Sequence, residues 1–543
     1  MKTEADTLRL KKQIKETKPT SRNPIYNSHL YWSQKSFNII DLVINELSAP
    51  GDTVFDPFMG SGVTLLEAVR ADYKRNAIGV DVNEMPTFIV KTILKDLNNG
   101  ENEGILTDFM SFLTSLDWYY ETVLPDGRNA RVTKVLFDKP NRTQNEFSIK
   151  ELHYQVGKEK GVLTGEDISL EDTQRFETYK DNLIVENVKL IPNSKIAVGK
   201  DDHIADIFTP RNFSVLNEVV QYIREKGNPD LLRYLLMSVL HLSKITDTHS
   251  NSQWPLWIPK VNAVEKNIID LLRQRIKNIR GTMEFVHDNY SEELSVITQG
   301  QSVDGQFVKV LMKGSQNITN DDIPDDSVDL VITDPPYMDQ VLYSEYMQLY
   351  QPFLNFQFNL EDEIVVSNAE NRGKNKNIYF DLLNSVFNVT SRKAKEDAYM
   401  ALYFHDSSLL VWNDLLKVLE LNGFKYITQQ HIPKTRTLKN ILSPKKSLSG
   451  DAILLFQNTK RPVIVEPELL DLQSMVDGIN SQAKLILAKE GRPLGTPELY
   501  DLGVMEFVIQ NGWLQQLSEN FPSLVEIFEQ ELIWIPEPGV WDV

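Results

Sequence analysis

Short apolar runs alternate with amphipathic segments in two separate parts of the chain. Residues 38–48 carry apolar side chains at helical spacing, and residues 53–55 and 77–80 form apolar runs typical of buried strands. The same alternation resumes near residue 307, with strand ends expected at 310, 333, 404, 430 and 457. Because strands that alternate with helices build a sheet covered by helices, the pattern predicts an α/β fold.

The region between these two parts follows a different pattern. Residues 118–200 have short alternating segments and turn dipeptides, whereas residues 212–292 carry apolar stripes at helical spacing. After residue 460 the pattern is mostly helical, with prolines between the segments. We therefore predict one α/β sheet split by a large insertion, and four parts: 1–100, the first half of the α/β domain; 101–300, the insertion; 301–460, the second half; and 461–543, a helical extension.

Composition narrows the class of protein. At 543 residues the chain is expected to hold two to four domains, and 41% hydrophobic with 24% charged residues is ordinary for a globular protein. No window approaches the ~20 apolar residues of a membrane span, and the polar start lacks the apolar core of a signal peptide. The absence of cysteine excludes disulfides and thiolate zinc sites. We expect a cytoplasmic protein without a metal.

The net charge of −19 argues against indiscriminate binding to nucleic acid, but it permits a locally basic groove. Basic residues gather in the N-terminal segment, at 273–280 and at 425–450, and each cluster is also typical of a solvated face. The run at 425–450 contains no acid and lies inside the second α/β half, so it is the predicted DNA contact. Its candidate residues are Lys434, Arg436, Lys439, Lys445 and Lys446.

The segment from Asp56 to Gly62 (Asp-Pro-Phe-Met-Gly-Ser-Gly) follows the first predicted strand. A glycine loop between a strand and a helix lets a ligand approach the backbone, and Asp81 lies near the spacing of about 20 residues at which an acid reaches ribose hydroxyls. A lone tight turn is the alternative. Leu65 stands where a dinucleotide motif needs a third glycine, and no lysine follows Gly62 as a triphosphate loop requires. S-adenosylmethionine, which has a ribose but no pyrophosphate, fits this pattern.

The run Asp334-Pro335-Pro336-Tyr337 ends the apolar strand 328–333. Successive prolines fix the backbone and lack N–H donors, so the corner is rigid and rich in acceptors. An exocyclic amino group of a nucleobase needs acceptors for its N–H bonds and an aromatic surface for stacking, which Tyr337 offers. The alternative is a strand end followed by a surface turn. Together with the glycine loop, the motif predicts methylation of an amino group.

Two further groups of residues are weaker candidates for the functional site. Tyr343 is a candidate for the base pocket, although the spacing of Tyr343, Tyr346 and Tyr350 is also typical of core packing. His405-Asp406 lacks partners at metal-ligand spacing, so no metal site is predicted.

These motifs resemble those of the amino-methylating DNA methyltransferases of prokaryotes, over residues 24–95 and 305–457. The segment Ser33-Gln34-Lys35-Ser36-Phe37 is similar to the one that covers the methionine end of the cofactor in that family, although Ser36 stands where the family usually has proline. The family often places an acid near Gly314-Ser315 to contact the adenine of the cofactor, and this chain has Ser315 instead. Some relatives carry a cysteine zinc ribbon in the insertion, which this chain lacks.

The resemblance implies a Rossmann-like methyltransferase sheet with the target-recognition region in the insertion. It implies a catalytic motif at Asp334, Pro335, Pro336 and Tyr337. It also implies cofactor contacts at Gln34, Lys35, Asp56, Phe58, Gly60, Ser61, Gly62, Asp81 and Ser315.

The resemblance further implies a site-specific enzyme that methylates adenine in double-stranded DNA, within a restriction or phage-defence system and with defence subunits as possible partners. Such an enzyme is expected in the cytoplasm, on the nucleoid when it binds DNA. Three alternatives stay open: an N4-cytosine DNA methyltransferase, a tRNA guanine amino-methyltransferase, and an inactive adaptor with a methyltransferase fold.

Overall fold

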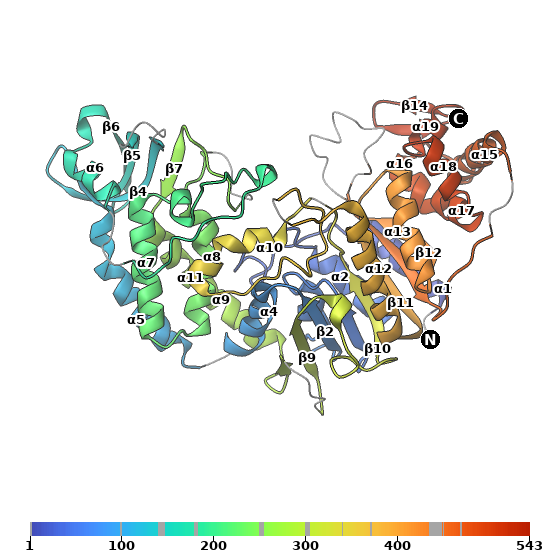
Figure 1. The fold of residues 1–543 in the computed structure, drawn as a ribbon, viewed down its shortest axis with the longest axis horizontal. Coiled ribbons are helices and arrows are strands. Elements are labelled where there is room, and N and C mark those ends of the chain that lie inside the picture. Colours follow the sequence, from blue (N-terminus) through green and yellow to red (C-terminus); the bar gives the residue numbers. More distant parts are fainter. Residues whose placement is uncertain are drawn as a thin grey trace.

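A computed structural model describes residues 3–97, 100–139, 147–178, 183–248, 255–298, 304–338, 340–369, 372–433, 448, 450–466 and 470–543. Within these ranges, no helix has both the length and the apolar character that crossing a bilayer requires. Figure 1 shows a central sheet flanked by helices, with one lobe at each end of the long axis.

The central sheet has eight strands and determines the position of the candidate site. Its order is β12 (Phe424–His431), β13 (Ala452–Asn458), β11 (Ala394–Phe404), β10 (Val328–Thr333), β1 (Thr53–Asp56), β2 (Asn76–Asp81), β9 (Phe307–Met312) and β8 (Ser295–Ile297). All neighbours are parallel except the two pairs that include β13. This mixed sheet with its helices confirms the predicted α/β class.

Strands from both ends of the sequence meet at the centre of this sheet. Phe55 in β1 is the register partner of Val331 in β10 on one side and of Ile78 in β2 on the other. All three side chains are buried, which explains the apolar runs. Because the strands are parallel, their carboxyl ends lie at one edge of the sheet, and the residues that end or follow them are brought together there.

Helices cover both faces of the sheet and bury two apolar clusters. The cluster on one face includes residues of α2 (Phe37–Leu47), α3 (Val63–Ala68), α4 (Glu84–Lys91) and the π-helical turn η1 (Thr92–Asp96). The other cluster includes residues of α12 (Lys376–Lys393) and α13 (Leu409–Leu421). In α2, the buried positions follow the helical spacing seen in the sequence: Ile39, Ile40, Val43, Ile44 and Leu47.

The N-terminal segment forms α1 (Glu4–Glu16), which the hydrophobic pattern did not predict. Some of its basic side chains form hydrogen bonds or ion pairs with other parts of the protein. Lys11 donates to the Thr428 hydroxyl and to the Asp501 carbonyl, both at 2.8 Å, and Arg9 pairs with Glu46 at 2.6 Å. These contacts attach α1 to β12 and to the C-terminal region, so part of this basic stretch serves packing.

Most of the described residues between 101 and 290 form the lobe on the left of Figure 1, whereas Ser295–Ile297 is strand β8 of the central sheet although it lies within the predicted insertion. The lobe's strands build a separate five-stranded sheet: β3 (Glu121–Val123), β4 (Asn129–Asp138), β5 (Ser148–Val156), β6 (Glu159–Thr164) and β7 (Ala263–Lys266). Its helices are α5 (Asn102–Ser115), α6 (Leu170–Phe176), α7 (Pro210–Glu225), α8 (Asp230–Ser243) and α9 (Ile268–Asn289). On α9, Arg273 pairs with Asp117 and Arg280 with Glu103, so these cations also have partners within the chain.

The C-terminal region packs on α13 and β12, at the right of Figure 1. Its helices are α15 (Leu472–Glu490), α16 (Thr496–Leu499), α17 (Met505–Gln510), α18 (Leu514–Asn520) and α19 (Val525–Phe528). It ends in a hairpin of β14 (Ile533–Ile535) and β15 (Val540–Asp542), which the sequence pattern did not predict because three-residue strands give too little periodicity. Asp501 joins the region to β12, accepting from the Gln430 side chain and the His431 backbone.

Short elements complete the fold. They are α10 (Tyr343–Tyr346), α11 (Gln351–Leu354), η2 (Asp117–Tyr120), η3 (Gly165–Asp167), η4 (Ser194–Ile196), η5 (Ile204–Ile207), η6 (Ser315–Asn317), η7 (Met347–Leu349) and η8 (Tyr500–Val504). The consecutive elements α10, η7 and α11 follow the catalytic motif predicted at 334–337 and lead the chain away from the sheet edge.

Candidate functional site

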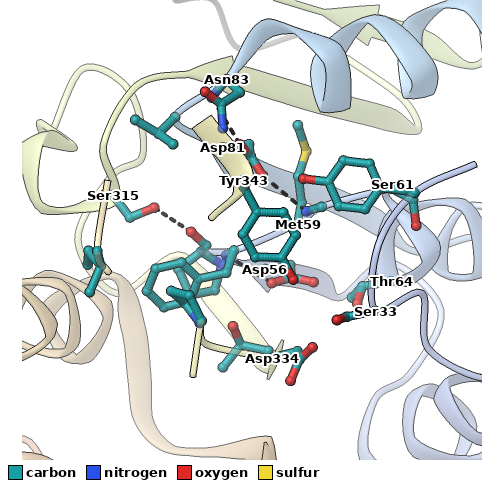
Figure 2. A pocket seen from close by; sticks show the side chains of 18 of the residues that line it. Ser33, Asp56, Met59, Ser61, Thr64, Asp81, Asn83, Ser315, Asp334 and Tyr343 are labelled. Carbon is teal, nitrogen blue, oxygen red and sulfur yellow. Dashed lines mark hydrogen bonds between the residues drawn. The ribbon is translucent and has the colours of Figure 1, made fainter. Parts of the chain in front are cut away.

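A pocket lies at the edge of the sheet where β1, β2 and β10 end (Figure 2). Figure 2 shows Asp56, Asp81 and Tyr343 around the same space, with Asp334 at its border. The predicted site residues that line this pocket are Gln34, Lys35, Asp56, Phe58, Gly60, Ser61, Asp81, Ser315, Asp334, Pro336 and Tyr343. Gly62, Pro335 and Tyr337 lie beside it without lining it.

The loop between β1 and α3 needs glycine at two positions. Gly60 and Gly62 have φ values of 48° and 75°, which L side chains rarely adopt. A Cβ at Gly62 would lie 2.1 Å from Cγ2 of Val90, and a Cβ at Gly60 would lie 3.0 Å from the Tyr31 ring. Gly62 therefore permits close packing of the loop on α4, while Gly60 lets the Tyr31 ring approach the backbone.

Two carboxylates border the loop, Asp56 buried and Asp81 partly buried. Asp56 accepts from the Phe58 backbone N–H at 3.0 Å, and Asp81 accepts from the N–H groups of Gly60 at 3.3 Å and Asn83 at 3.0 Å. Burial raises the pKa of each carboxyl to about 7, although these hydrogen bonds oppose the rise. Asp81 thus stands next to the glycine loop, as its spacing in the sequence predicted.

Asp334 is paired with a lysine across the pocket. The Lys35 ammonium lies 2.9 Å from Oδ2 of Asp334 and 3.3 Å from Oδ2 of Asp451. Oδ1 of Asp334 is buried and has no geometric hydrogen-bond partner among the described residues. Burial raises the pKa of Asp334, and Lys35 opposes that rise. The motif therefore has one carboxylate oxygen held by a cation and one buried oxygen without a geometric partner among the described residues.

The tyrosine of the motif is anchored at its hydroxyl. Tyr337 donates to the backbone carbonyl of Tyr403 at 2.7 Å, and Tyr379 donates to the carbonyl of Pro336 at 2.7 Å. These two bonds fix the corner after β10. The Tyr337 side chain is partly buried, packs against the apolar cluster that includes α12 and α13, and does not line the pocket.

Aromatic side chains form one wall, and sequence reasoning missed part of it. Tyr343 stacks on Tyr31 with centroids 5.8 Å apart and planes at 15°. Tyr346 packs on Trp32 with centroids 5.0 Å apart, and Tyr350 is fully buried, so these two tyrosines serve packing. Tyr31 and Trp32 line the pocket directly before the predicted residues Gln34 and Lys35. Their closeness in sequence to Gln34 and Lys35 was the only sequence feature that could have placed Tyr31 and Trp32 at the pocket.

A buried ion network behind the wall was also missed. Arg372 lies 2.7 Å from Glu345 and 2.8 Å from Glu363, and all three side chains are at most 4% exposed. Asn193, from the 101–300 region, donates to Glu345 at 2.7 Å. Glu363 lines the pocket and accepts from the backbone of Ser344. The network thus connects the left lobe to a wall of the pocket.

The remaining predicted residues have specific local roles or fall outside the described ranges. The Ser315 hydroxyl donates to the Pro57 carbonyl at 2.5 Å, and Gln34 makes a long 3.5 Å contact with the Ser61 hydroxyl. The basic residues predicted to contact DNA all lie outside the described residues: Lys434, Arg436, Lys439, Lys445 and Lys446. Among the residues that the structure describes, no three His, Asp or Glu side chains gather in a metal-binding arrangement.

Known proteins match the N-terminal part of the chain and, at lower identity, most of its length. A family model for DNA methylases, named for N6 and N4 methyltransferases, matches residues 5–89. "Type II methyltransferase M.EcaI" from Enterobacter cloacae is 42% identical over 101 residues, 19% of this chain and 20% of that protein. "Type II methyltransferase M.MvaI" from Kocuria varians is 21% identical over 413 residues, 72% of each chain. The match therefore spans only about a fifth of the length of M.EcaI.

These matches support the family that the motifs indicated. The resemblance to the amino-methylating DNA methyltransferases is confirmed, both in the segment that holds the glycine loop and over most of the chain.

Proposed function

We propose that the protein transfers a methyl group from S-adenosylmethionine to the exocyclic amino group of adenine in double-stranded DNA. One observation carries this proposal: the glycine loop after β1, Asp81 at the end of β2 and Asp334 after β10 all line one pocket. The proposed cofactor site and the proposed acceptor for the amino group therefore lie in the same pocket.

The pocket fits the cofactor on structural grounds. Gly60 and Gly62 let Tyr31 and Val90 pack closely on the loop that borders the pocket, and Asp81 is a partly buried pocket carboxylate whose charged form can accept from ribose hydroxyls. We assign Gln34, Asp56, Phe58, Ser61 and Ser315 to the same cofactor region, and Gly62 to the packing that shapes the loop. Tyr31, stacked on Tyr343, adds an aromatic lid over Gly60.

The transfer step requires an amino nitrogen with available electrons. When bound, S-adenosylmethionine would supply the methyl group, with its sulfur keeping the electron pair of the broken bond. The base nitrogen would bond the carbon, and the proton that it loses would pass through its hydrogen bond to Asp334 and on to solvent. Oδ1 of Asp334 is the buried acceptor for an N–H of the amino group, and the Pro335 carbonyl is the proposed second acceptor. Accepting both N–H bonds favours a tetrahedral nitrogen with a localised lone pair.

The partly buried ring of Tyr337 lies beside the pocket and is the proposed stacking surface for an extruded base. Its hydroxyl is held by Tyr403, so the ring cannot swing freely into the pocket. Tyr343 is proposed to line the base side of the pocket. Pro336 contributes rigidity, because its carbonyl is bonded by Tyr379.

We further propose that the sheet is a Rossmann-like methyltransferase sheet whose halves, 1–100 and 301–460, are separated by a target-recognition insertion at 101–300, with 461–543 as an extension. The basic run at 425–450, including Lys434, Arg436, Lys439, Lys445 and Lys446, is the proposed phosphate contact. The proposed setting is a site-specific enzyme in a prokaryotic restriction or defence system, acting in the cytoplasm on nucleoid DNA.

The base assignment is tested with methyl-labelled S-adenosylmethionine and a DNA library that covers many short sequences, followed by digestion to nucleosides. Label in N6-methyladenine supports the proposal, and label only in N4-methylcytosine replaces adenine by cytosine. Competition between duplex DNA and tRNA tests the RNA alternative. Calorimetry with the cofactor tests the adaptor alternative, because an adaptor with a decayed pocket gives no heat of binding.

A further inference from the structure

The ammonium of Lys35 lies among groups of the catalytic corner. Lys35 lies between Gln34 and Ser36, the residue before α2, and its side chain is 14% exposed. Besides Asp334 and Asp451, the ammonium lies 5.8 Å from the centroid of the Tyr337 ring and 5.1 Å from that of Tyr403. It therefore faces two carboxylates and two aromatic rings that lie on three separate segments of the second α/β half.

The two carboxylate oxygens of Asp334 have different environments. Oδ2 is held by Lys35 at 2.9 Å, while Oδ1 is buried without a geometric partner among the described residues. A buried acceptor without a partner is unfavourable, and a ligand that supplies a donor would satisfy it. The Tyr337 hydroxyl donates to the Tyr403 carbonyl at 2.7 Å, and its hydrogen-bond interaction with Asp334 lowers the pKa of that carboxyl.

We propose that Lys35 is a positioning residue of the methyl-transfer step: its ammonium keeps Asp334 ionised and holds Oδ2, so that Oδ1 accepts an N–H of the amino group. Asp451 is the second partner of that ammonium and weakens its effect on Asp334. This inference rests on the proposed function, and it assigns Lys35 to the catalytic corner rather than to the cofactor.

Ionisation of Asp334 decides the direction of its hydrogen bond. A carboxylate only accepts, whereas a protonated carboxyl presents an O–H donor. An amino group that must keep its lone pair for the methyl carbon needs an acceptor for its N–H, because a donor would compete for that lone pair. Protonation of Asp334 therefore stops the step without removing any side chain.

The groups around Asp334 and Lys35 have opposite effects on the pKa values of these two residues. Burial raises the pKa of Asp334, Lys35 lowers it and Asp451 raises it. Burial lowers the pKa of Lys35, but the two carboxylates outweigh burial and the net pKa is raised, so the ammonium stays charged. The ionisable groups around the pair are Asp56, Tyr337, Tyr343, Tyr379, Tyr403, Asp451 and, 3.9 Å from Asp451, His405.

The full-length protein and four variants test this assignment. Lys35→Met removes the charge at similar length, Lys35→Arg keeps it, and Asp451→Asn removes the competing anion. Lys376→Met is the matched control, because Lys376 forms an ion pair of the same type with Asp414 on the exposed side of α12. Single-turnover methyl transfer to duplex DNA is measured against pH. In parallel, the infrared carboxyl band that disappears in Asp334→Asn is titrated without DNA or cofactor.

We expect opposite shifts from the two charge removals. In Lys35→Met, both the acid limb of the rate and the Asp334 band move to higher pH by about 1–3 units, the effect of losing an opposite charge at this distance. In Asp451→Asn both move to lower pH. Lys35→Arg and Lys376→Met retain the wild-type pH midpoint, and calorimetric cofactor affinity changes less than threefold in Lys35→Met.

The experiments distinguish failure of the Lys35 assignment from failure of the proposed methyltransferase function. An unshifted Asp334 band in Lys35→Met, or a large loss of cofactor affinity with an unchanged pH midpoint, overturns the positioning role of Lys35. A wild-type protein that binds cofactor but methylates no nucleic acid overturns the proposed function. The infrared titration does not need activity, so it decides the charge relationship in either case.

Discussion

Phe55 in β1 and Val331 in β10 are register partners in adjacent parallel strands, although the region of 101–298 lies between them in the chain. This pairing places Asp56, which ends β1, beside the motif that starts at Asp334 after β10. Thr53 adds a hydrogen bond to the Asp329 carboxylate at 3.0 Å near the other end of the same strands. The two halves of the candidate site are therefore brought together by the sheet itself.

Asp334→Ala should separate catalysis from cofactor binding. The substitution removes the acceptor of the amino group but leaves Asp81 and the glycine loop intact. We expect a loss in single-turnover rate of about 10²-fold or more, the scale of removing one preorganised polar group, with cofactor affinity close to wild type. Rate and calorimetric affinity are measured on the same preparations. A parallel loss of both would mean that Asp334 is structural.

Asp81→Asn should show the reverse pattern. The carboxylate accepts from two backbone N–H groups at the pocket and is the proposed ribose partner. Charge-assisted hydrogen bonds contribute about 1.5–3 kcal/mol each, so losing the charge should weaken cofactor binding roughly 10- to 100-fold. At saturating cofactor the rate should recover most of its wild-type value. An unchanged affinity in calorimetry would remove Asp81 from the cofactor site.

The stability of the protein without cofactor should fall as the pH rises from about 4 to about 7. Asp56 and Asp81 have pKa values raised from 3.8 to about 7 by burial. Between these limits the folded state binds more protons than the unfolded state, so deprotonation favours unfolding. Urea midpoints at pH 5 and pH 7.5 measure the effect. Asp56→Asn should flatten the profile, and a wild-type stability that rises over this interval would contradict the assignment.

Arg372→Met should destabilise the fold strongly. The substitution leaves Glu345 and Glu363 buried without their shared cation, and breaking a buried pair in this way costs about 3–5 kcal/mol. Lys376→Met, in an exposed pair, should cost less than about 1 kcal/mol. Urea unfolding compares the two. Adding Glu363→Gln to Arg372→Met should restore part of the loss, whereas equal costs for both single variants would contradict a buried network.

Gly62→Ala should disrupt the loop more than an equivalent change elsewhere. Gly157 also has a positive φ, of 58°, but a Cβ there would meet no described atom within 4 Å, so Gly157→Ala measures the backbone cost alone, about 1–2 kcal/mol. At Gly62 the added Cβ also collides with Val90. We expect a larger loss of stability and cofactor binding there, with partial rescue by Val90→Ala. The absence of any rescue would show that the collision is not the cause.

The sequence predicted those features that local patterns encode. Apolar strand runs, the glycine loop and the acids at strand ends follow from periodicity and spacing, and the order of motifs allowed the strands to be placed in one sheet. Lys35 was predicted beside the cofactor because its segment precedes the loop, but which carboxylate a flexible lysine reaches depends on tertiary packing. The pairing of Arg372 with Glu345, and the contact of Asn193 with that glutamate, likewise carry no local pattern.

Nucleoside analysis of duplex DNA, after incubation with methyl-labelled S-adenosylmethionine and either wild-type protein or Asp334→Ala, tests the proposed adenine methylation most directly. We expect labelled N6-methyladenine with the wild type and at least a hundredfold less with the variant, at equal cofactor occupancy. Wild-type protein that binds the cofactor yet leaves every nucleobase amino group unlabelled would contradict this proposal.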